Sequence, residues 1–277
     1  MYRKFAQAAK TFKNNSMILA FEVVGKGEPL IILHGFLGSS DNWRVISRRL
    51  GAHYKVFAID LRNHGRSPHS DIFDYDVMAA DLREFVEQQS LRSIALLGHS
   101  MGGKVAMKFA IEYSEQIDRL IIVDIGPKPY EPSKRYLLEA LLSLDLTRYK
   151  SFADVGAALA AEIPGESLRK FLLKNLARDS NGRLHWKVHL EAIYQNYDKL
   201  AQGFAPGRTF DKPTLFIRGG RSNYIEDDDA PLIRQIFLQA EIATLPAAGH
   251  WVHIDTPEEF LQTVLNFLNT ADVMFRR

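Results

Sequence analysis

The stretch "LLGHSMGGK", residues 96–104, places Gly98, Ser100 and Gly102 in a G-x-S-x-G pattern directly after an apolar run. Where a strand turns sharply into a helix, the positions two before and two after the central residue are crowded, and only small side chains fit there. Such a turn lifts the central side chain above the sheet edge and directs the helix N-terminus toward it. A helix-capping serine in a Gly-rich turn is the structural alternative. The strand-like "SIAL" before the pattern and the helix-forming "KVAMKFAIEY" after it favour a nucleophilic Ser100.

Apolar runs of strand length alternate with amphipathic, helix-like segments on both sides of this stretch. The runs are rich in β-branched residues and bounded by Gly, Pro or Asp, which is typical of buried parallel strands. They cover residues 30–33, 55–60, 93–98, 119–125, 214–218 and 241–246. Helices are predicted at 75–89, from an apolar face, and at 257–269, from a Pro-Glu-Glu start. The alternation predicts an α/β fold with a mostly parallel central sheet flanked by helices.

The alternation stops in the middle of the chain. A proline-rich stretch that begins at Pro127 ends the preceding strand, and the residues that follow it are aromatic and helix-forming. We therefore expect an all-helical insertion of roughly 80 residues that forms a lid rather than an independent domain. On this prediction residues 1–126 and 213–277 form the core, and residues 127–212 form the helical lid.

The composition of the 277-residue chain is that of an ordinary globular protein, with 46% hydrophobic and 25% charged residues. The net charge of +2 is too small to indicate binding to nucleic acid or to an anionic membrane. No apolar run approaches the ~18 residues of a membrane-spanning helix. Without cysteine the chain cannot form disulfides or thiolate nucleophiles, and we expect a cytoplasmic location. The first fifteen residues are basic and lack acids; we interpret them as a solvated N-terminus, with a transit peptide as the alternative.

The loop after the first buried strand, "LHGFLGSSDNW" (residues 33–43), is the predicted source of an oxyanion hole. Acyl transfer places negative charge on the substrate oxygen, and two preorganised N–H donors stabilise that charge. We expect one donor to be the backbone N–H of Met101 and the other to be the backbone N–H of Phe36. Gly35 would allow a close backbone approach, and His34 could brace the loop or contact the substrate. An ordinary turn is the alternative interpretation of this loop.

A histidine after the last predicted strand could serve as the general base for Ser100. His250 follows Gly249 in "PAAGHWVH", where small residues free a loop to reach back to the nucleophile. His253, three residues later, is the alternative base. The spacings of the other histidines match no metal-binding pattern, and no metal site is expected.

Five ordered motifs resemble those of a known family. They are "DLRNHGRS" (60–67), "GHSMGGK" (98–104), "VDIGP" (123–127), "RGGRSNYI" (218–225) and "AGHWVH" (248–253). Together with the order serine, acid, histidine, they make the chain similar to the α/β-hydrolase superfamily over nearly its whole length. The motifs look like those of small bacterial carboxylesterases and their mitochondrial relative, α/β-hydrolase domain-containing protein eleven. The resemblance implies an α/β-hydrolase fold that hydrolyses short- to medium-chain acyl esters, with thioesters as substrates of some members.

The carboxylate that should orient the histidine is missing from one of its two expected places. The turn after the strand at 214–218 holds Arg-Ser-Asn at 221–223 and no acid. Asp124 ends another apolar strand, where a buried carboxylate is costly unless it is paired, and the resemblance also implies an acid there. The acids at 226–229 precede a helix, where acids commonly serve the N-terminus, and they remain the alternative.

The predicted reaction uses Ser100 as nucleophile, His250 as general base and acid, and Asp124 as orienting carboxylate, without a metal or organic cofactor. The predicted partner is a small-molecule acyl ester. The side chains expected to contact it are His34, Tyr224, Trp186 and Trp251. An acyl thioesterase or a carbon–carbon bond hydrolase would use the same three residues. A non-catalytic binding module on this fold would typically lack one of them.

Overall fold

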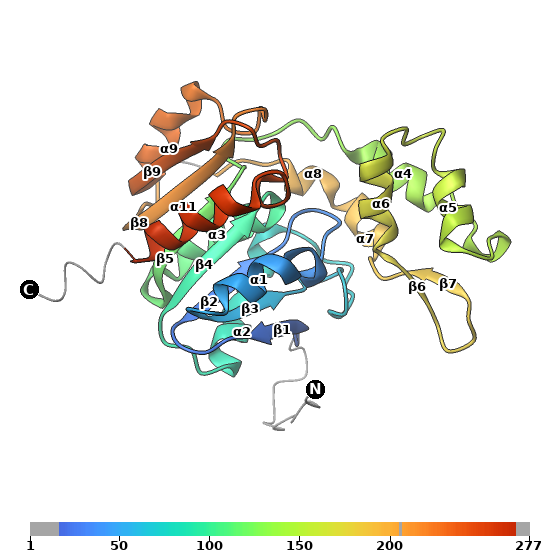
Figure 1. Ribbon diagram of the computed structural model, residues 1–277, viewed down its shortest axis with the longest axis horizontal. Helices are drawn as coiled ribbons and strands as arrows, with labels where there is room; N and C mark the ends of the chain where they lie inside the picture. The colour runs from blue at the N-terminus through green and yellow to red at the C-terminus, as the bar shows by residue number, and fades with distance from the viewer. Residues whose placement is uncertain (1–16, 205–206, 270–277) are drawn as a thin grey trace, which may run out of the picture.

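The computed structural model describes residues 17–204 and 207–269, and a seven-stranded β-sheet forms its centre (Figure 1). In spatial order the strands are β1 (Phe21–Val24), β3 (Lys55–Ile59), β2 (Pro29–Leu33), β4 (Ile94–His99), β5 (Ile117–Val123), β8 (Phe210–Gly219) and β9 (Phe237–Leu245). Strand β1 pairs antiparallel with β3, and the other neighbours in this sheet pair parallel. The predicted α/β fold with a mostly parallel sheet is confirmed.

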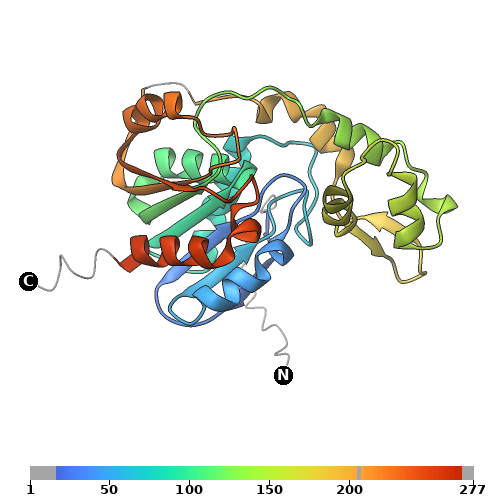
Figure 2. The ribbon, with the colours of Figure 1, turned by 45° about the horizontal axis from the view of Figure 1, so that its top comes forward.

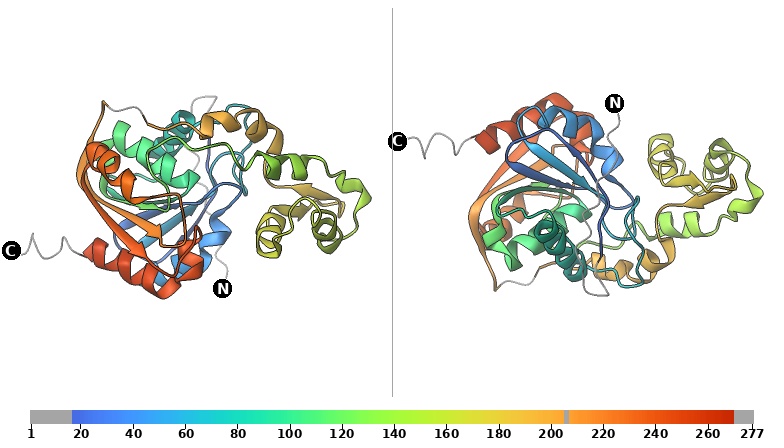
Figure 3. Two further views of the ribbon diagram at one scale, coloured as in Figure 1. Left: turned by 90° about the horizontal axis from the view of Figure 1, so that it is seen from above. Right: turned by 90° about the horizontal axis from the view of Figure 1, so that it is seen from below.

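Helices cover both faces of the sheet (Figure 2 and Figure 3). One face carries α2 (Tyr75–Gln88), α3 (Met101–Glu112) and α9 (Ala230–Ile236), and the other carries α1 (Arg44–Leu50) and α11 (Pro257–Asn269). Successive side chains of β2 point to opposite faces, with Ile31 and Leu33 in the first layer and Leu30 and Ile32 in the second. All four are fully buried, which explains why the parallel strands have unbroken apolar sequences.

The two edge strands differ most from the sequence prediction. Strand β1 is not predicted, because its four residues are half-buried or exposed and present no apolar run. Strand β9 begins before its predicted run, because its first half mixes buried Phe237 with exposed Leu238 and Gln239 and shows no continuous buried pattern. The core also contains short helical turns, which are η1 (Ser40–Trp43), η2 (Ser114–Gln116), η4 (Asp227–Asp229) and α10 (Val252–Asp255).

The insertion between β5 and β8 projects away from the core sheet (Figure 1). It contains α4 (Arg135–Leu142), η3 (Leu146–Arg148), α5 (Phe152–Ala158), α6 (Glu166–Leu173), β6 (Leu176–Arg178), β7 (Leu184–Trp186), α7 (Leu190–Gln195) and α8 (Tyr197–Leu200). The antiparallel pair β6–β7 shows that the expectation of an all-helical lid is wrong. The chain reverses there because the Asp179 carboxylate accepts the N–H groups of Asn181 and Arg183, and Gly182 adopts a φ of +77°.

Two further predictions concern membrane spans and the N-terminal segment. No helix within 17–204 and 207–269 is long and apolar enough to cross a membrane. The basic segment 1–15, predicted to be a solvated N-terminus, lies outside the described residues.

Candidate active site

Five neighbouring strands, β2, β4, β5, β8 and β9, end at the same edge of the sheet because they run parallel. Neighbouring strands lie about 4.8 Å apart, so the loops that follow them meet. These loops carry Phe36, Ser100, Asp124, Ser222 and His250. The predicted residues therefore gather at the carboxyl edge, where open α/β sheets bind their ligands.

Ser100 occupies a strained turn between β4 and α3, with a φ of 52° and a ψ of −119°. A Cβ atom added to Gly98 would lie 2.2 Å from the carbonyl oxygen of Gly102. One added to Gly102 would lie 2.6 Å from the carbonyl oxygen of Leu33. Both positions therefore require glycine, which is the crowding that the G-x-S-x-G pattern predicts.

His250 lies between Ser100 and Asp124. Its Nε2 atom is 3.0 Å from Ser100 Oγ, and its Nδ1 atom is 2.7 Å from Asp124 Oδ2. When the Nδ1–H group donates to the carboxylate, Nε2 keeps a lone pair that can accept the Ser100 hydroxyl proton. The three side chains that sequence patterns single out are thus joined in one row of hydrogen bonds.

The Asp124 carboxylate is completely buried, and three donors satisfy it. The Gly219 N–H group donates to Oδ1 at 2.9 Å, while the Ser222 hydroxyl and the His250 ring both contact Oδ2. These hydrogen bonds offset the cost of burying a carboxylate. Asp124 also has a left-handed backbone, with a φ of 50°, which is a strained conformation that clusters at functional sites.

The contact between Ser222 and Asp124 is one that the sequence does not predict. The turn after β8 has no acid, and it instead supplies a hydroxyl to the acid at the end of the neighbouring strand β5. The contact follows from the strand register. Val123 of β5 pairs opposite Ile217 of β8, so the residues that follow these two strands lie close together. Ser222 thus positions the carboxylate that contacts His250.

The acids at 226–229 make other contacts. Glu226 and Asp229 form a capping box at η4. Asp229 also forms an ion pair with Lys128 at 2.7 Å. No contact within the described residues joins these acids to His250. They therefore stand where helix-start acids are expected.

The predicted oxyanion donors belong to two segments that meet beside Ser100. Phe36 is in the loop after β2, and Met101 is the first residue of α3. Within residues 17–204 and 207–269, neither backbone N–H group donates a hydrogen bond to another backbone group. A Cβ atom on Gly35 would lie 2.8 Å from His99 Nδ1, so glycine lets the Phe36 loop approach the Ser100 turn closely.

His34 braces this loop from within the core. Its Nδ1–H group donates to the Gly35 carbonyl at 2.8 Å, and its Nε2 atom accepts the Leu61 N–H at 3.0 Å. Burial lowers the pKa of His34, which keeps the ring neutral and able to accept that hydrogen bond. His34 is 1% exposed and lines neither of the cavities beside Ser100, so its contacts are those of a brace.

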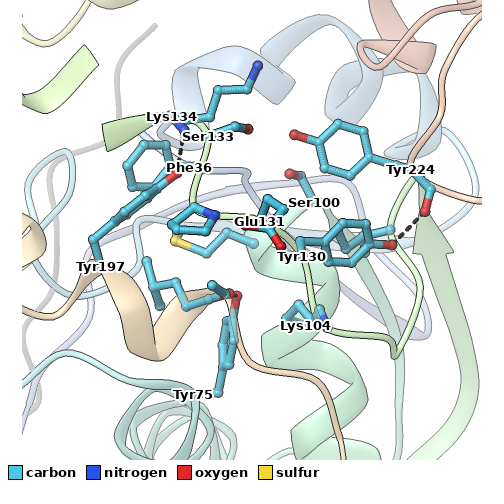
Figure 4. Close-up of a pocket in the computed structure, with 15 residues that line it drawn as sticks. Phe36, Tyr75, Ser100, Lys104, Tyr130, Glu131, Ser133, Lys134, Tyr197 and Tyr224 are labelled. Carbon is cyan, nitrogen blue, oxygen red and sulfur yellow. Dashed lines mark hydrogen bonds between the residues drawn. The ribbon is translucent and has the colours of Figure 1, made fainter. Parts of the chain in front are cut away.

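Two cavities of unequal size meet at Ser100. The small cavity, of about 80 Å³, extends from Ser100 toward Tyr75 and Lys104 (Figure 4). The large cavity, of about 590 Å³, extends past His250 to the insertion helix α6. Phe36 borders both cavities. A bound ester could therefore place its two halves on different sides of Ser100.

Two of the predicted substrate contacts line these cavities and Trp186 does not. Tyr224 borders both, and its ring stacks on His250 with centroids 4.0 Å apart. Trp251 lines the large cavity, with its ring centroid 5.5 Å from that of Phe171. Trp186 lies in β7 and packs against the hydrophobic core instead.

Two further histidines hold the His250 loop. His99 donates from Nε2 to the His250 carbonyl at 2.9 Å. His253, the alternative base, is nearly fully buried and stacks on Trp43 with ring centroids 4.0 Å apart. Burial lowers the pKa of His99, and it lowers the pKa of His253 to about 3. His253 therefore packs the loop, whereas His250 reaches Ser100.

Stability should fall as the solution becomes acidic, because His64 and His253 are buried as neutral rings. Burial lowers the pKa of each to about 3, from an ordinary value of 6.5. Below pH 6.5 the unfolded state binds protons that the folded state does not. Each histidine then removes about 1.4 kcal/mol of stability per pH unit until the folded pKa is reached. Urea unfolding at pH 7, 6 and 5 measures this slope.

A His253→Gln variant provides the control for this prediction. It keeps a polar side chain but cannot titrate, so its stability should decrease less between pH 7 and pH 5 than that of the wild type. Equal slopes for the two proteins would contradict the prediction. Asp60 does not disturb this measurement. Its pKa is lowered from the ordinary value of 3.8, so its carboxylate stays charged between pH 7 and pH 5.

Residues 17–204 and 207–269 contain no group of three or more His, Asp or Glu side chains that could hold a metal ion. His69 and His189 have ring centroids 5.0 Å apart. His69 Nε2 contacts the Lys187 carbonyl at 3.0 Å, a hydrogen bond that uses this nitrogen within the protein.

Comparison with known proteins identifies the family. The family model for the alpha/beta hydrolase fold matches residues 28–257. The sn-1-specific diacylglycerol lipase ABHD11 of Danio rerio is 36% identical over 257 residues, covering 90% of this chain and 80% of the relative. A putative esterase/lipase of Haemophilus influenzae is 35% identical, covering 87% of this chain and 83% of the relative. Esterase YbfF of Escherichia coli is 29% identical, covering 95% of this chain and 97% of the relative.

Solved structures agree with the sequence comparisons. A structure described as a marine microorganism esterase matches with a TM-score of 0.88 and 41% identity, covering 91% of this chain and 100% of that chain. The stretch matched by the family model includes Ser100, Asp124 and His250. The chain therefore belongs to the alpha/beta hydrolase fold family, in the subgroup of small esterases related to ABHD11 that its motifs resemble.

Proposed function

We propose that this chain is a serine carboxylesterase that hydrolyses short- to medium-chain acyl esters of small molecules. Its relatives are named as esterases and lipases, and this chain is likewise an ester-hydrolysing enzyme. The observation that carries the finer proposal is the row of hydrogen bonds from Ser100 through His250 to Asp124, at 3.0 and 2.7 Å. A nucleophile, a base and an orienting carboxylate in this geometry suit acyl transfer. A cytoplasmic location stays a prediction from the absence of cysteine.

The proposed reaction proceeds through an acyl-enzyme. Ser100 attacks the ester carbonyl carbon while His250 Nε2 takes the hydroxyl proton. The N–H groups of Phe36 and Met101 stabilise the negative charge on the carbonyl oxygen. His250, held by Asp124, then gives its Nε2 proton to the leaving alcohol. Water repeats the sequence on the acyl-enzyme, releases the acid and restores Ser100.

A non-catalytic binding module would not need the strain seen at this site. Ser100 and Asp124 both have left-handed backbones, and such conformations persist where the surrounding structure and function require them. A thioesterase or a carbon–carbon bond hydrolase would use the same three side chains. The esterase proposal is preferred because relatives from Danio rerio, Haemophilus influenzae and Escherichia coli, each matching most of this chain, carry lipase or esterase names.

A fluorophosphonate probe tests the proposed nucleophile directly. We expect the probe to label the folded protein on Ser100 alone, because His250 activates this hydroxyl and no other described serine contacts the ring. Peptide mapping by mass spectrometry locates the adduct, and hydrolysis of p-nitrophenyl butyrate should be lost in parallel. Heat-unfolded protein is the control and should not be labelled. An adduct on another residue, or no adduct on an actively hydrolysing protein, would refute the proposed nucleophile.

A further inference from the structure

The small and large cavities at Ser100, of about 80 and 590 Å³, divide the space open to an ester. We propose that the small cavity holds the acyl group and the large cavity holds the alcohol. The enzyme would then prefer short-chain acyl esters of large apolar alcohols. This inference rests on the proposed serine esterase function. It narrows the acyl group of that function to short chains, and it adds which half of the substrate is large.

The position of His250 decides which side the alcohol occupies. His250 lines the large cavity and is not among the residues that line the small one. Because Nε2 must donate a proton to the leaving oxygen, that oxygen lies on the His250 side of Ser100. Tyr224 stacks on His250 and borders both cavities, so it marks the boundary between them. The acyl chain is left with the small cavity.

The inner end of the small cavity is fixed by buried hydrogen bonds. Lys104 is 1% exposed, and its Nζ donates to the carbonyls of Lys128 at 2.6 Å and Gln202 at 3.3 Å. These two carbonyls belong to the two segments that connect the insertion to the core. The Tyr75 hydroxyl donates to the Leu200 carbonyl at 2.8 Å. Figure 4 shows Tyr75 and Lys104 together at the bottom of the view. Lengthening the cavity would leave the buried Lys104 amine without acceptors, which is costly.

The small cavity is the one that suits a short acyl group. Its volume of about 80 Å³ is a small fraction of the 590 Å³ of the large cavity, so the longer half of an ester has more room in the large one.

The walls of the large cavity are mostly apolar. The hydrophobic side chains that line it include Leu37, Leu137, Leu168, Phe171, Trp251 and Ile254. Burying one more methylene of the alcohol against such walls raises kcat/KM by about fourfold. A longer alkyl alcohol should therefore improve the substrate until the cavity is filled.

Two isomeric esters separate the acyl and alcohol assignments. Hexyl acetate and ethyl hexanoate have the same formula and similar alkoxide leaving groups, and they differ in which half is long. We expect kcat/KM for hexyl acetate to exceed that for ethyl hexanoate by at least about tenfold. Equal values, or a preference for ethyl hexanoate, would overturn the assignment. Failure to hydrolyse either ester or p-nitrophenyl acetate would instead count against the proposed esterase function.

Cavity variants test the same assignment within one enzyme. Leu200 lines the small cavity, and Leu200→Ala should raise kcat/KM for ethyl hexanoate relative to hexyl acetate by about fivefold. Leu200→Val leaves a smaller gap, and it replaces the alanine variant if that protein does not fold. Leu168 lines the large cavity, and Leu168→Ala should change the alcohol preference but keep the acyl-length profile on p-nitrophenyl esters. A relaxed acyl limit in Leu168→Ala, with none in the Leu200 variants, would reverse the assignment.

Discussion

Replacing Ser100 with alanine should reduce kcat for p-nitrophenyl butyrate by at least about 10⁴-fold. The variant keeps the Cβ atom and the turn, with its φ of 52°, but has no oxygen that could attack the ester. His250 Nε2, which lies 3.0 Å from Ser100 Oγ, would then have no proton to accept. Steady-state kinetics measures the loss. The variant is purified separately from the wild type, because a trace of wild-type enzyme would hide a loss of this size.

The matched control for this experiment is Ser143→Ala. The Ser143 hydroxyl donates to the Ala140 carbonyl at 2.9 Å in the insertion, and it lines neither cavity. This variant should keep wild-type kcat, while both variants should unfold at nearly the temperature of the wild type. If Ser100→Ala retained more than a small part of the activity, another residue would have to be the nucleophile.

Replacing Asp124 with asparagine should lower kcat by about 10⁴-fold. The change preserves size and burial, but an amide can turn its NH₂ group toward His250 Nδ1. The ring then carries its proton on Nε2 and can no longer accept the Ser100 hydroxyl proton. The same p-nitrophenyl butyrate assay measures the loss, and KM should change much less than kcat because Asp124 lines neither cavity.

Asp227→Asn is the control that separates the two candidate positions for the acid. Asp227 forms an exposed ion pair with Arg218 at 2.7 Å, and exposed pairs contribute little. Its kcat should equal that of the wild type. A nearly normal Asp124→Asn together with an inactive Asp227→Asn would show that the acid assignment is wrong.

The Ser222 contact allows a stricter test of where the acid can stand. Ser222 contacts the same carboxylate oxygen of Asp124 that faces His250. Adding Ser222→Asp to the Asp124→Asn variant should therefore recover part of the lost kcat, since a carboxylate again reaches the His250 ring. Ser222→Ala alone should lower kcat modestly, because it removes one of the three donors to Asp124.

Strands that are buried on both faces could be predicted from the sequence. The runs that became β2, β4 and β5 are continuous and apolar because both faces of these strands are covered by helices. Gly98 and Gly102 indicate the turn at Ser100. A Cβ on Gly98 would meet the backbone of Gly102, four residues on, whereas a Cβ on Gly102 would meet the Leu33 carbonyl of the neighbouring strand. The Gly98 constraint acts within the turn, and a local pattern records it.

Elements at the surface were less predictable. The pair β6–β7 has three residues in each strand, and its residues are mostly half-buried or exposed, so no alternating apolar pattern marks it. The edge strand β1 is similar. Both depend on pairing with a neighbour more than on their own composition.

By itself the sequence determined the strand–turn–helix around Ser100, the buried parallel strands of the core, and the family. Tertiary structure alone decided which side chains meet: the Ser222–Asp124 contact joins residues 98 apart, and the His250–Ser100 contact joins residues 150 apart. It also decided that two cavities of different size meet at Ser100, with His250 in only one of them. The physical reason is that periodicity, and the crowding of Gly98 against Gly102, act within a few residues. The neighbours of a loop at the sheet edge are instead set by the lateral order of the strands, which no local pattern encodes.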